Sequence, residues 1–115
     1  MTKSYRQITR SVSASLVKLR AGKPDIMKAF NALGEAATVD GALSRKTKEL
    51  IALALGVAEH CDACLAFHLQ ALIKLGATRA EIEEALGVAV YMGGGPSLMY
   101  AADALTAFDE LSAPS

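Results

Sequence analysis

The chain has 115 residues, of which 52% are apolar and 21% charged, and its 12 basic and 12 acidic side chains cancel. This composition is typical of a globular domain rather than a disordered chain, and the zero net charge disfavours nucleic acid as a partner. The longest apolar run, residues 50–58, is far shorter than the roughly 20 residues that span a bilayer, and the N-terminus lacks the apolar core of a signal peptide. We therefore expect a cytoplasmic protein without membrane contact.

The spacing of apolar residues predicts an all-α bundle of about six helices in a single domain over residues 1–115. Glycines, prolines and capping residues place the helices at about 4–20, 24–34, 45–58, 62–75, 79–92 and 96–111. The third helix is apolar nearly all round from Leu50 onward, so we expect it to be central and buried. Because a short chain buries little apolar surface alone, we also expect a homo-oligomer.

Two segments admit more than one interpretation. Residues 1–24 hold six basic and no acidic residues, as transit peptides do, but they also carry an apolar stripe of Tyr5, Ile8, Val12, Leu16 and Leu19. The stripe favours a basic helix that packs on the core or on a neighbouring subunit. Gly93-Gly94-Gly95 lacks the lysine and Ser/Thr of a phosphate-binding loop, and we interpret it as a flexible or tightly packed turn between helices.

Cys61 and Cys64 are the two cysteines of the chain, and they lie at the predicted start of the fourth helix. Three residues apart on a helix, they share a face and are within disulfide reach. Unpaired N–H groups and the positive dipole end at a helix N-terminus stabilise a thiolate. His68 follows Cys64 by four residues on the same face, where a neutral imidazole can accept the thiol proton.

Other uses of these residues remain open. His60 precedes Cys61 and would point away from the Cys64–His68 face, so it is either an exposed loop residue or an auxiliary proton donor. Zinc competes for any Cys-x-x-Cys pair, but a structural zinc site needs four ligands, and the chain has no second pair of Cys or His. We therefore predict no metal and no other cofactor, unless a neighbouring subunit completes a site.

Three motifs occur together in this chain: Gly41-Ala-Leu-Ser-Arg-Lys-Thr-Lys-Glu-Leu, Cys61-Asp-Ala-Cys-Leu-Ala-Phe-His and Met92-Gly-Gly-Gly-Pro. With the intervening Glu-x11-Cys-x2-Cys-x3-His spacing, they resemble the alkyl hydroperoxidase D-like (carboxymuconolactone decarboxylase) family over about residues 25–111. The resemblance implies an all-helical fold that assembles as trimers or hexamers. It also implies a peroxidase that reduces organic hydroperoxides and is recycled by a dithiol, either a protein or a lipoyl-type molecule.

The resemblance further implies a role for each site residue. Cys64 would be the peroxidatic thiol, which becomes a sulfenic acid, and Cys61 would be the resolving thiol. His68 would be the base, and Glu49 its partner in a proton relay. From the residues alone, Glu49 is an ordinary glutamate near a helix start, but it directly precedes an apolar run, and a carboxylate entering a core needs a partner.

Two features qualify this hypothesis. Glu59 is a fallback carboxylate, although its closeness to Cys61 is more typical of a solvated loop. The best-studied family members have a histidine between the cysteines, where this chain has Asp62-Ala63. Asp62 would raise the thiol pKa values slightly by its charge while favourably capping the helix.

Two other functions compete with a peroxidase. A carboxymuconolactone decarboxylase-like lyase would use Glu49 and His68 as acid and base, but that branch of the family generally lacks the dithiol. A non-enzymatic redox-sensing or binding oligomer would show no turnover with any dithiol donor.

Overall fold

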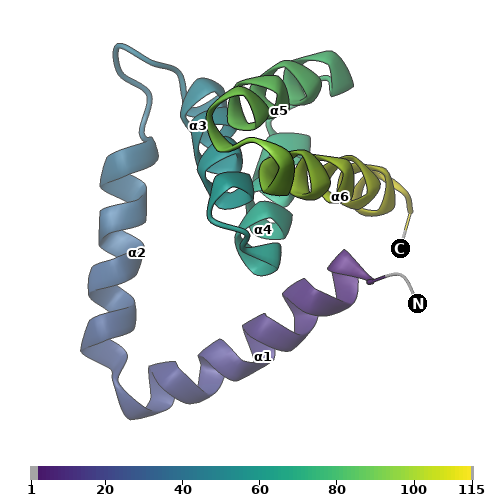
Figure 1. The fold of residues 1–115 in the computed structure, drawn as a ribbon. Helices are drawn as coiled ribbons and strands as arrows, with labels where there is room; N and C mark the ends of the chain where they lie inside the picture. The colour runs from purple at the N-terminus through teal and green to yellow at the C-terminus, as the bar shows by residue number, and fades with distance from the viewer. Residues whose placement is uncertain (1–2, 115) are drawn as a thin grey trace.

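The structure is a computed structural model that describes residues 3–114, and within that range it contains six α-helices and no strand. Figure 1 shows α1 (Tyr5–Gly22), α2 (Pro24–Thr38), α3 (Arg45–Ala58), α4 (Asp62–Lys74), α5 (Arg79–Gly93) and α6 (Gly95–Ser112). The predicted all-α class is confirmed. The predicted caps of two helices are also present, because the side chains of Ser44 and Thr78 accept hydrogen bonds from the first turns of α3 and α5.

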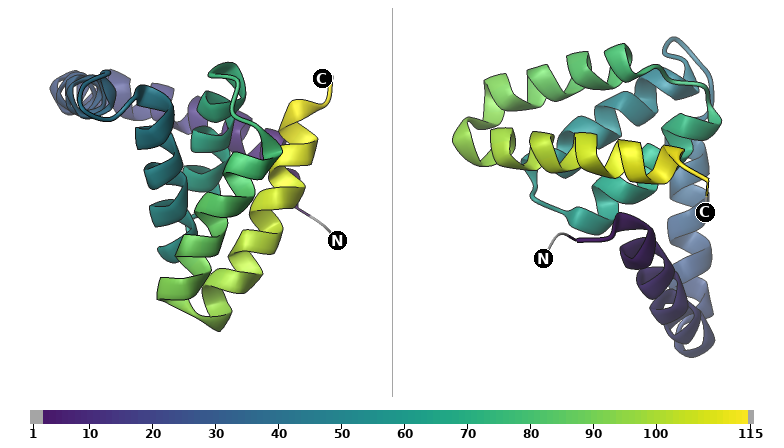
Figure 2. Two further views of the ribbon diagram at one scale, coloured as in Figure 1. Left: turned by 90° about the horizontal axis from the view of Figure 1, so that it is seen from above. Right: turned by 90° about the vertical axis from the view of Figure 1, so that its right-hand side faces the viewer.

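Helix α4 lies inside the bundle and packs against α1, α3 and α6, while α5 covers α3 and α6 (Figure 2). Three leucines of α4, Leu65, Leu69 and Leu72, have no exposed surface. Burying each of them contributes about 1.5–3 kcal/mol relative to leaving it in water. The helix that carries the dithiol is therefore the best-buried part of the fold. Around these leucines lie Leu53, Val57, Ile82, Leu86, Ala101, Ala104 and Ala107.

The start of α1 is fixed to the end of α6 by Glu110. Its carboxylate accepts hydrogen bonds from the Ser4 hydroxyl at 2.8 Å and from the backbone N–H groups of Tyr5 and Arg6 at 2.8 and 3.1 Å. The Arg6 guanidinium donates in return to the carbonyl of Glu110 at 2.8 Å. The first half of α1 thus packs on the core of its own chain, whereas Leu19 near its end is 45% exposed.

Helix α2 stands away from the bundle and follows α1 as the second half of an arm (Figure 1). Its one buried residue is Met27. Three apolar side chains spaced along one helical face, Ile26, Phe30 and Leu33, are 58%, 66% and 64% exposed. This face has no covering partner among the residues that the structure describes.

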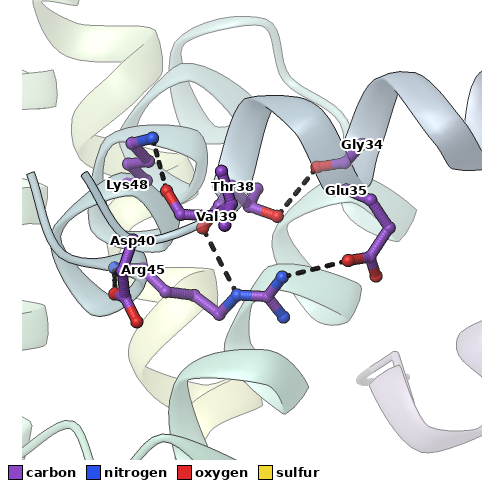
Figure 3. A network of polar contacts seen from close by, with 7 residues as sticks. All are labelled: Gly34, Glu35, Thr38, Val39, Asp40, Arg45 and Lys48. Atoms are coloured by element: carbon purple, nitrogen blue, oxygen red, sulfur yellow. Dashed lines mark hydrogen bonds and ion pairs between the residues drawn. The ribbon is translucent and has the colours of Figure 1, made fainter.

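A polar network holds the end of α2 to the start of α3 (Figure 3). The Arg45 guanidinium donates to the carbonyl of Thr38 at 3.3 Å and pairs with Glu35 at 3.4 Å. Lys48 donates to the carbonyl of Val39 at 2.7 Å. Two carbonyls at the end of α2 therefore accept hydrogen bonds from side chains of α3, which ties the two helices together at this point.

The predicted end of the second helix at Gly34 is wrong, because α2 continues to Thr38. A glycine inside an exposed helix costs about 1 kcal/mol relative to alanine. The next residues, Glu35-Ala36-Ala37, are strong helix formers that offset this cost, and the Thr38 hydroxyl donates back to the carbonyl of Gly34 at 2.8 Å. The loop between α2 and α3 is therefore shorter than the predicted helix bounds of 24–34 and 45–58 imply.

The prediction that α3 is central is confirmed, since it packs against α4, α5 and α6, but the prediction that it is buried is wrong for one face. Leu53 and Val57 are fully buried, but Ile51 and Leu55 are 47% and 58% exposed. One face of α3 packs on its neighbours in the chain and the other remains uncovered. The apolar run identified a helix correctly but did not show which of its faces would be covered.

The triple glycine forms a tightly packed turn, one of the two predicted forms. Gly93 ends α5, Gly94 has a positive φ of 72°, and Gly95 begins α6. A Cβ on Gly93 would collide with the side chain of Ser97, which is 1% exposed. The turn needs glycine for both backbone conformation and close packing.

Candidate functional site

The two cysteines form a disulfide at the N-terminus of α4, with their Cα atoms 5.2 Å apart. Cys61 is the N-cap residue, with extended backbone dihedrals, and its Sγ accepts a hydrogen bond from the N–H of Cys64 at 3.1 Å. The predicted position of Cys61 at the helix start is confirmed. In the reduced protein, the same N–H group and the helix dipole would stabilise a Cys61 thiolate.

Gly56 of α3 lies directly against the dithiol. Its carbonyl accepts a hydrogen bond from the N–H of Cys61 at 3.0 Å. A Cβ at Gly56 would lie 3.3 Å from the Cβ of Cys64 and 3.4 Å from the backbone nitrogen of Leu65. The first of these distances is tighter than an ordinary van der Waals contact, so the close crossing of α3 and α4 at the site favours glycine. Sequence analysis missed this residue, although a lone glycine within the apolar run of α3 is a signal for close packing.

Glu49 and His68 meet between α3 and α4. The Glu49 side chain is 12% exposed, and its Oε2 lies 2.7 Å from Nδ1 of His68, whose side chain is 35% exposed. When Glu49 is ionised, its carboxylate only accepts hydrogen bonds, so the contact then places a proton on Nδ1 and leaves Nε2 as the basic nitrogen. The pair holds the imidazole in one orientation and one tautomer, on the helix that carries Cys64 one turn earlier.

The two remaining candidates, His60 and Glu59, lie outside this pair. His60 is exposed, adopts a positive φ of 58° in the turn between α3 and α4, and stacks its ring on Tyr100 of α6. The ring centroids are 4.9 Å apart and the planes differ by 13°. Glu59 is the exposed C-cap of α3. In the structure, Glu49 and His68 therefore contact each other, whereas His60 contacts Tyr100 instead.

Asp62, the first residue of α4, pairs with Lys3, which precedes α1. The Nζ of Lys3 lies 2.8 Å from Oδ2 of Asp62 and 5.8 Å from the centroid of the Tyr100 ring. The hydrogen bond that Lys3 donates to the Asp62 carboxylate raises the pKa of Lys3, so this side chain is cationic at neutral pH. Sequence analysis missed Lys3 because 59 residues separate it from Asp62, and no local pattern connects them.

Within residues 3–114, no group of three or more His, Cys, Asp or Glu side chains is arranged to hold a metal ion. None of the six helices combines the length and apolar character needed to cross a membrane. The chemistry available at the site, as described, is that of two thiols, one oriented imidazole and one carboxylate.

Comparisons with known proteins agree with this architecture. Residues 24–107 match the model of the carboxymuconolactone decarboxylase family. A protein of that family from Legionella pneumophila, solved in its apo form, has a TM-score of 0.93 and 57% identity and covers 95% of this chain and 97% of its own. A family member from Thermotoga maritima, described as a candidate for an antioxidative response, has a TM-score of 0.68 and 35% identity over 74% of this chain and 88% of its own.

An uncharacterized protein of Cupriavidus necator is 40% identical over 113 residues, which is 98% of this chain and all of that protein. The matched family model covers most of the chain, including both cysteines, Glu49 and His68. This chain belongs to the carboxymuconolactone decarboxylase family.

Proposed function

We propose that the protein is a dithiol peroxidase that reduces organic hydroperoxides. The observation that carries the proposal is the Glu49–His68 pair, which orients an imidazole on the same helix face as Cys64. A base held in one tautomer beside a thiol is what a nucleophilic cysteine needs to lose its proton at neutral pH. The description of the Thermotoga maritima relative as a candidate for an antioxidative response supports this class of reaction.

In the proposed reaction, Nε2 of His68 takes the proton of the Cys64 thiol, directly or through water. The thiolate attacks the terminal oxygen of the hydroperoxide, the O–O bond breaks, and an alcohol leaves with the proton that His68 returns. Cys64 becomes a sulfenic acid. The Cys61 thiol then attacks that sulfur, which releases water and closes the disulfide. A dithiol, either a protein or a lipoyl-type molecule, reduces the disulfide and is itself oxidised.

Each residue has a role of its own in this proposal. Glu49 stabilises the imidazolium that forms on His68, because its negative charge is held 2.7 Å from Nδ1 in a largely buried position. The N-terminus of α4 stabilises the thiolates. We assign no proton-transfer step to His60, because its ring stacks on Tyr100 and takes no part in the Glu49–His68 contact.

Intact mass after treatment with cumene hydroperoxide tests the function. We expect the reduced wild type to lose the mass of two hydrogens, Cys61→Ser to gain one oxygen, and Cys64→Ser to remain unchanged. Turnover measured with dihydrolipoamide as the reductant should disappear in Cys64→Ser. Peroxide consumption that persists without Cys64 would refute the proposal, and an oxygen found on Cys61 would reverse the order of the thiols.

We propose further that a second copy of the chain covers the exposed face of α2. The face of Ile26, Phe30 and Leu33 is apolar and more than half exposed, and contiguous patches of this kind mark interaction surfaces. The radius of gyration is 14.4 Å, compared with about 13 Å for a compact chain of this length. The arm formed by α1 and α2 accounts for the difference, and a trimer or hexamer would enclose it.

A further inference from the structure

The cysteines have an acidic neighbour whose charge is only partly exposed to water. Asp62 directly follows Cys61, and its side chain is 28% exposed. Its Oδ2 pairs with Lys3, while its Oδ1 is buried and has no hydrogen-bond partner among residues 3–114. A carboxylate beside a thiol disfavours the thiolate by repulsion, and more strongly when little water screens the charge. Lys3 is the cation that opposes this effect.

The groups that face Asp62 come from three elements. From α1, Tyr5 is 2% exposed, and burial, Asp103 and Asp62 together raise its pKa to about 12, so it is neutral at physiological pH. From α6 come Tyr100 and the carboxylate of Asp103, which raises the pKa of Tyr5 together with Asp62, and from the turn between α3 and α4 comes His60, which stacks on Tyr100. Apart from Lys3, the charged groups named here are the carboxylates of Asp62 and Asp103. The positive charge of Lys3 therefore strongly affects the electrostatic potential near Asp62.

Lys3 is held in place by the fold rather than by its own contact alone. The Ser4 hydroxyl and the Tyr5 backbone N–H each donate a hydrogen bond of 2.8 Å to the Glu110 carboxylate. These bonds fix the chain immediately after Lys3. Its ammonium group also lies over the ring of Tyr100, at 5.8 Å from the centroid. A cation placed by its neighbours loses less side-chain entropy when it pairs than a free surface lysine does.

We propose that Lys3 is a positioning residue for the dithiol: by neutralising Asp62, it increases the fraction of Cys61 that is ionised at neutral pH. The resolving thiol attacks the sulfenic acid of Cys64 as a thiolate. When a thiolate of the reductant later attacks the disulfide, a cysteine whose thiolate is stabilised is also the better leaving group. This inference rests on the proposed dithiol function. It adds a residue from outside the Cys-x-x-Cys motif to the control of the reaction.

The pH dependence of alkylation of Cys61 by iodoacetamide, in a Cys64→Ser background, tests the proposal. Lys3→Met removes the charge and keeps the aliphatic stem. We expect it to raise the thiol pKa by about half a unit, which slows alkylation roughly threefold below that pKa. Lys3→Arg should restore the parent profile. Lys3→Met combined with Asp62→Asn should return to it as well, since the charge that Lys3 opposed is then gone.

Two controls separate charge from structure. Lys18→Met removes an exposed lysine near the other end of α1 and should leave the profile unchanged. About 1 M salt should reduce the effect of Lys3→Met, because charges near the surface are screened. A Lys3→Met profile equal to that of the parent overturns the proposal, and so does a shift that Asp62→Asn fails to reverse. Alkylation requires no peroxide, so a protein that shows the shift without peroxide turnover would refute only the peroxidase function.

Discussion

At the Glu49–His68 pair, a carboxylate and an imidazole from different helices fix one proton between them. Replacing Glu49 by glutamine keeps the size of the side chain and removes its charge. We expect Glu49→Gln to lower peroxide turnover by at least about tenfold, because His68 loses both its orienting acceptor and the stabilisation of its protonated form. Steady-state rates with cumene hydroperoxide measure the effect.

Glu59→Gln is the matched control for this variant, since Glu59 is an exposed glutamate of the same helix region. It should retain wild-type turnover. Equal losses in the two variants would show that general charge near the site, rather than the contact with His68, controls the rate.

Gly56 affects the site through packing, because it lies where α3 crosses α4. We expect Gly56→Ala to destabilise the protein by about 1–3 kcal/mol, because the new methyl group would press on Cys64 and on the backbone of α4. Gly87→Ala is the control, since a Cβ there meets nothing within 4 Å, and it should stabilise α5 by about 0.5–1 kcal/mol. Urea unfolding of the reduced proteins would measure both changes, and a Gly56→Ala variant as stable as wild type would contradict the close crossing.

At the scale of elements, helix ends and their partners explain how α1 is attached. Glu110 acts as an external cap for α1, since its carboxylate receives two backbone N–H groups of the first turn. Burial acts to raise its pKa, but the hydrogen bonds from Ser4, Tyr5 and Arg6 outweigh burial and lower it. The lowered pKa means that the folded state prefers the ionised carboxylate.

This preference has a defined sign with pH. The stabilisation by Glu110 is present above the unfolded pKa of about 4.3 and is lost as the pH falls through the lower folded pKa. We therefore expect Glu110→Gln to be about 1 kcal/mol less stable than wild type at pH 7, and the difference to shrink in strong acid.

Urea unfolding at both pH values measures this difference. Glu84→Gln, at an exposed position of α5, should change stability little at either pH. A Glu110→Gln deficit that grew on acidification would have the wrong sign for this mechanism.

At the scale of the whole molecule, the arm of α1 and α2 is the least compact part of the fold (Figure 1). Phe30 lies at the centre of its exposed apolar face. We expect Phe30→Glu to shift the protein from an oligomer to a monomer, because a charge buried in the contact between copies would have no partner. Light scattering after size exclusion measures the mass. Asn31→Glu adds the same charge at the next position and should leave the oligomer intact, and a monomeric wild type would refute the assembly.

Much of the fold was predictable because it depends on local chemistry. Ser44 and Thr78 cap helices by bonding to their own first turns, and Cys61 does the same with its sulfur. Gly34 misled the prediction of a helix end because glycine weakens a helix without necessarily ending it. The outer face of α3 was misjudged because burial depends on neighbouring helices, and an apolar run does not specify which of its faces they cover.

The all-helical class, and the position of Cys61, Cys64 and His68 in the first turns of one helix, follow from residue type and helical periodicity alone. The family pattern added Glu49 as a candidate. Three contacts became visible only in the folded chain: Glu49 meets His68, Gly56 lies against Cys64, and Lys3 pairs with Asp62. These contacts join residues from different helices, and their distances are set by packing, which no local pattern records.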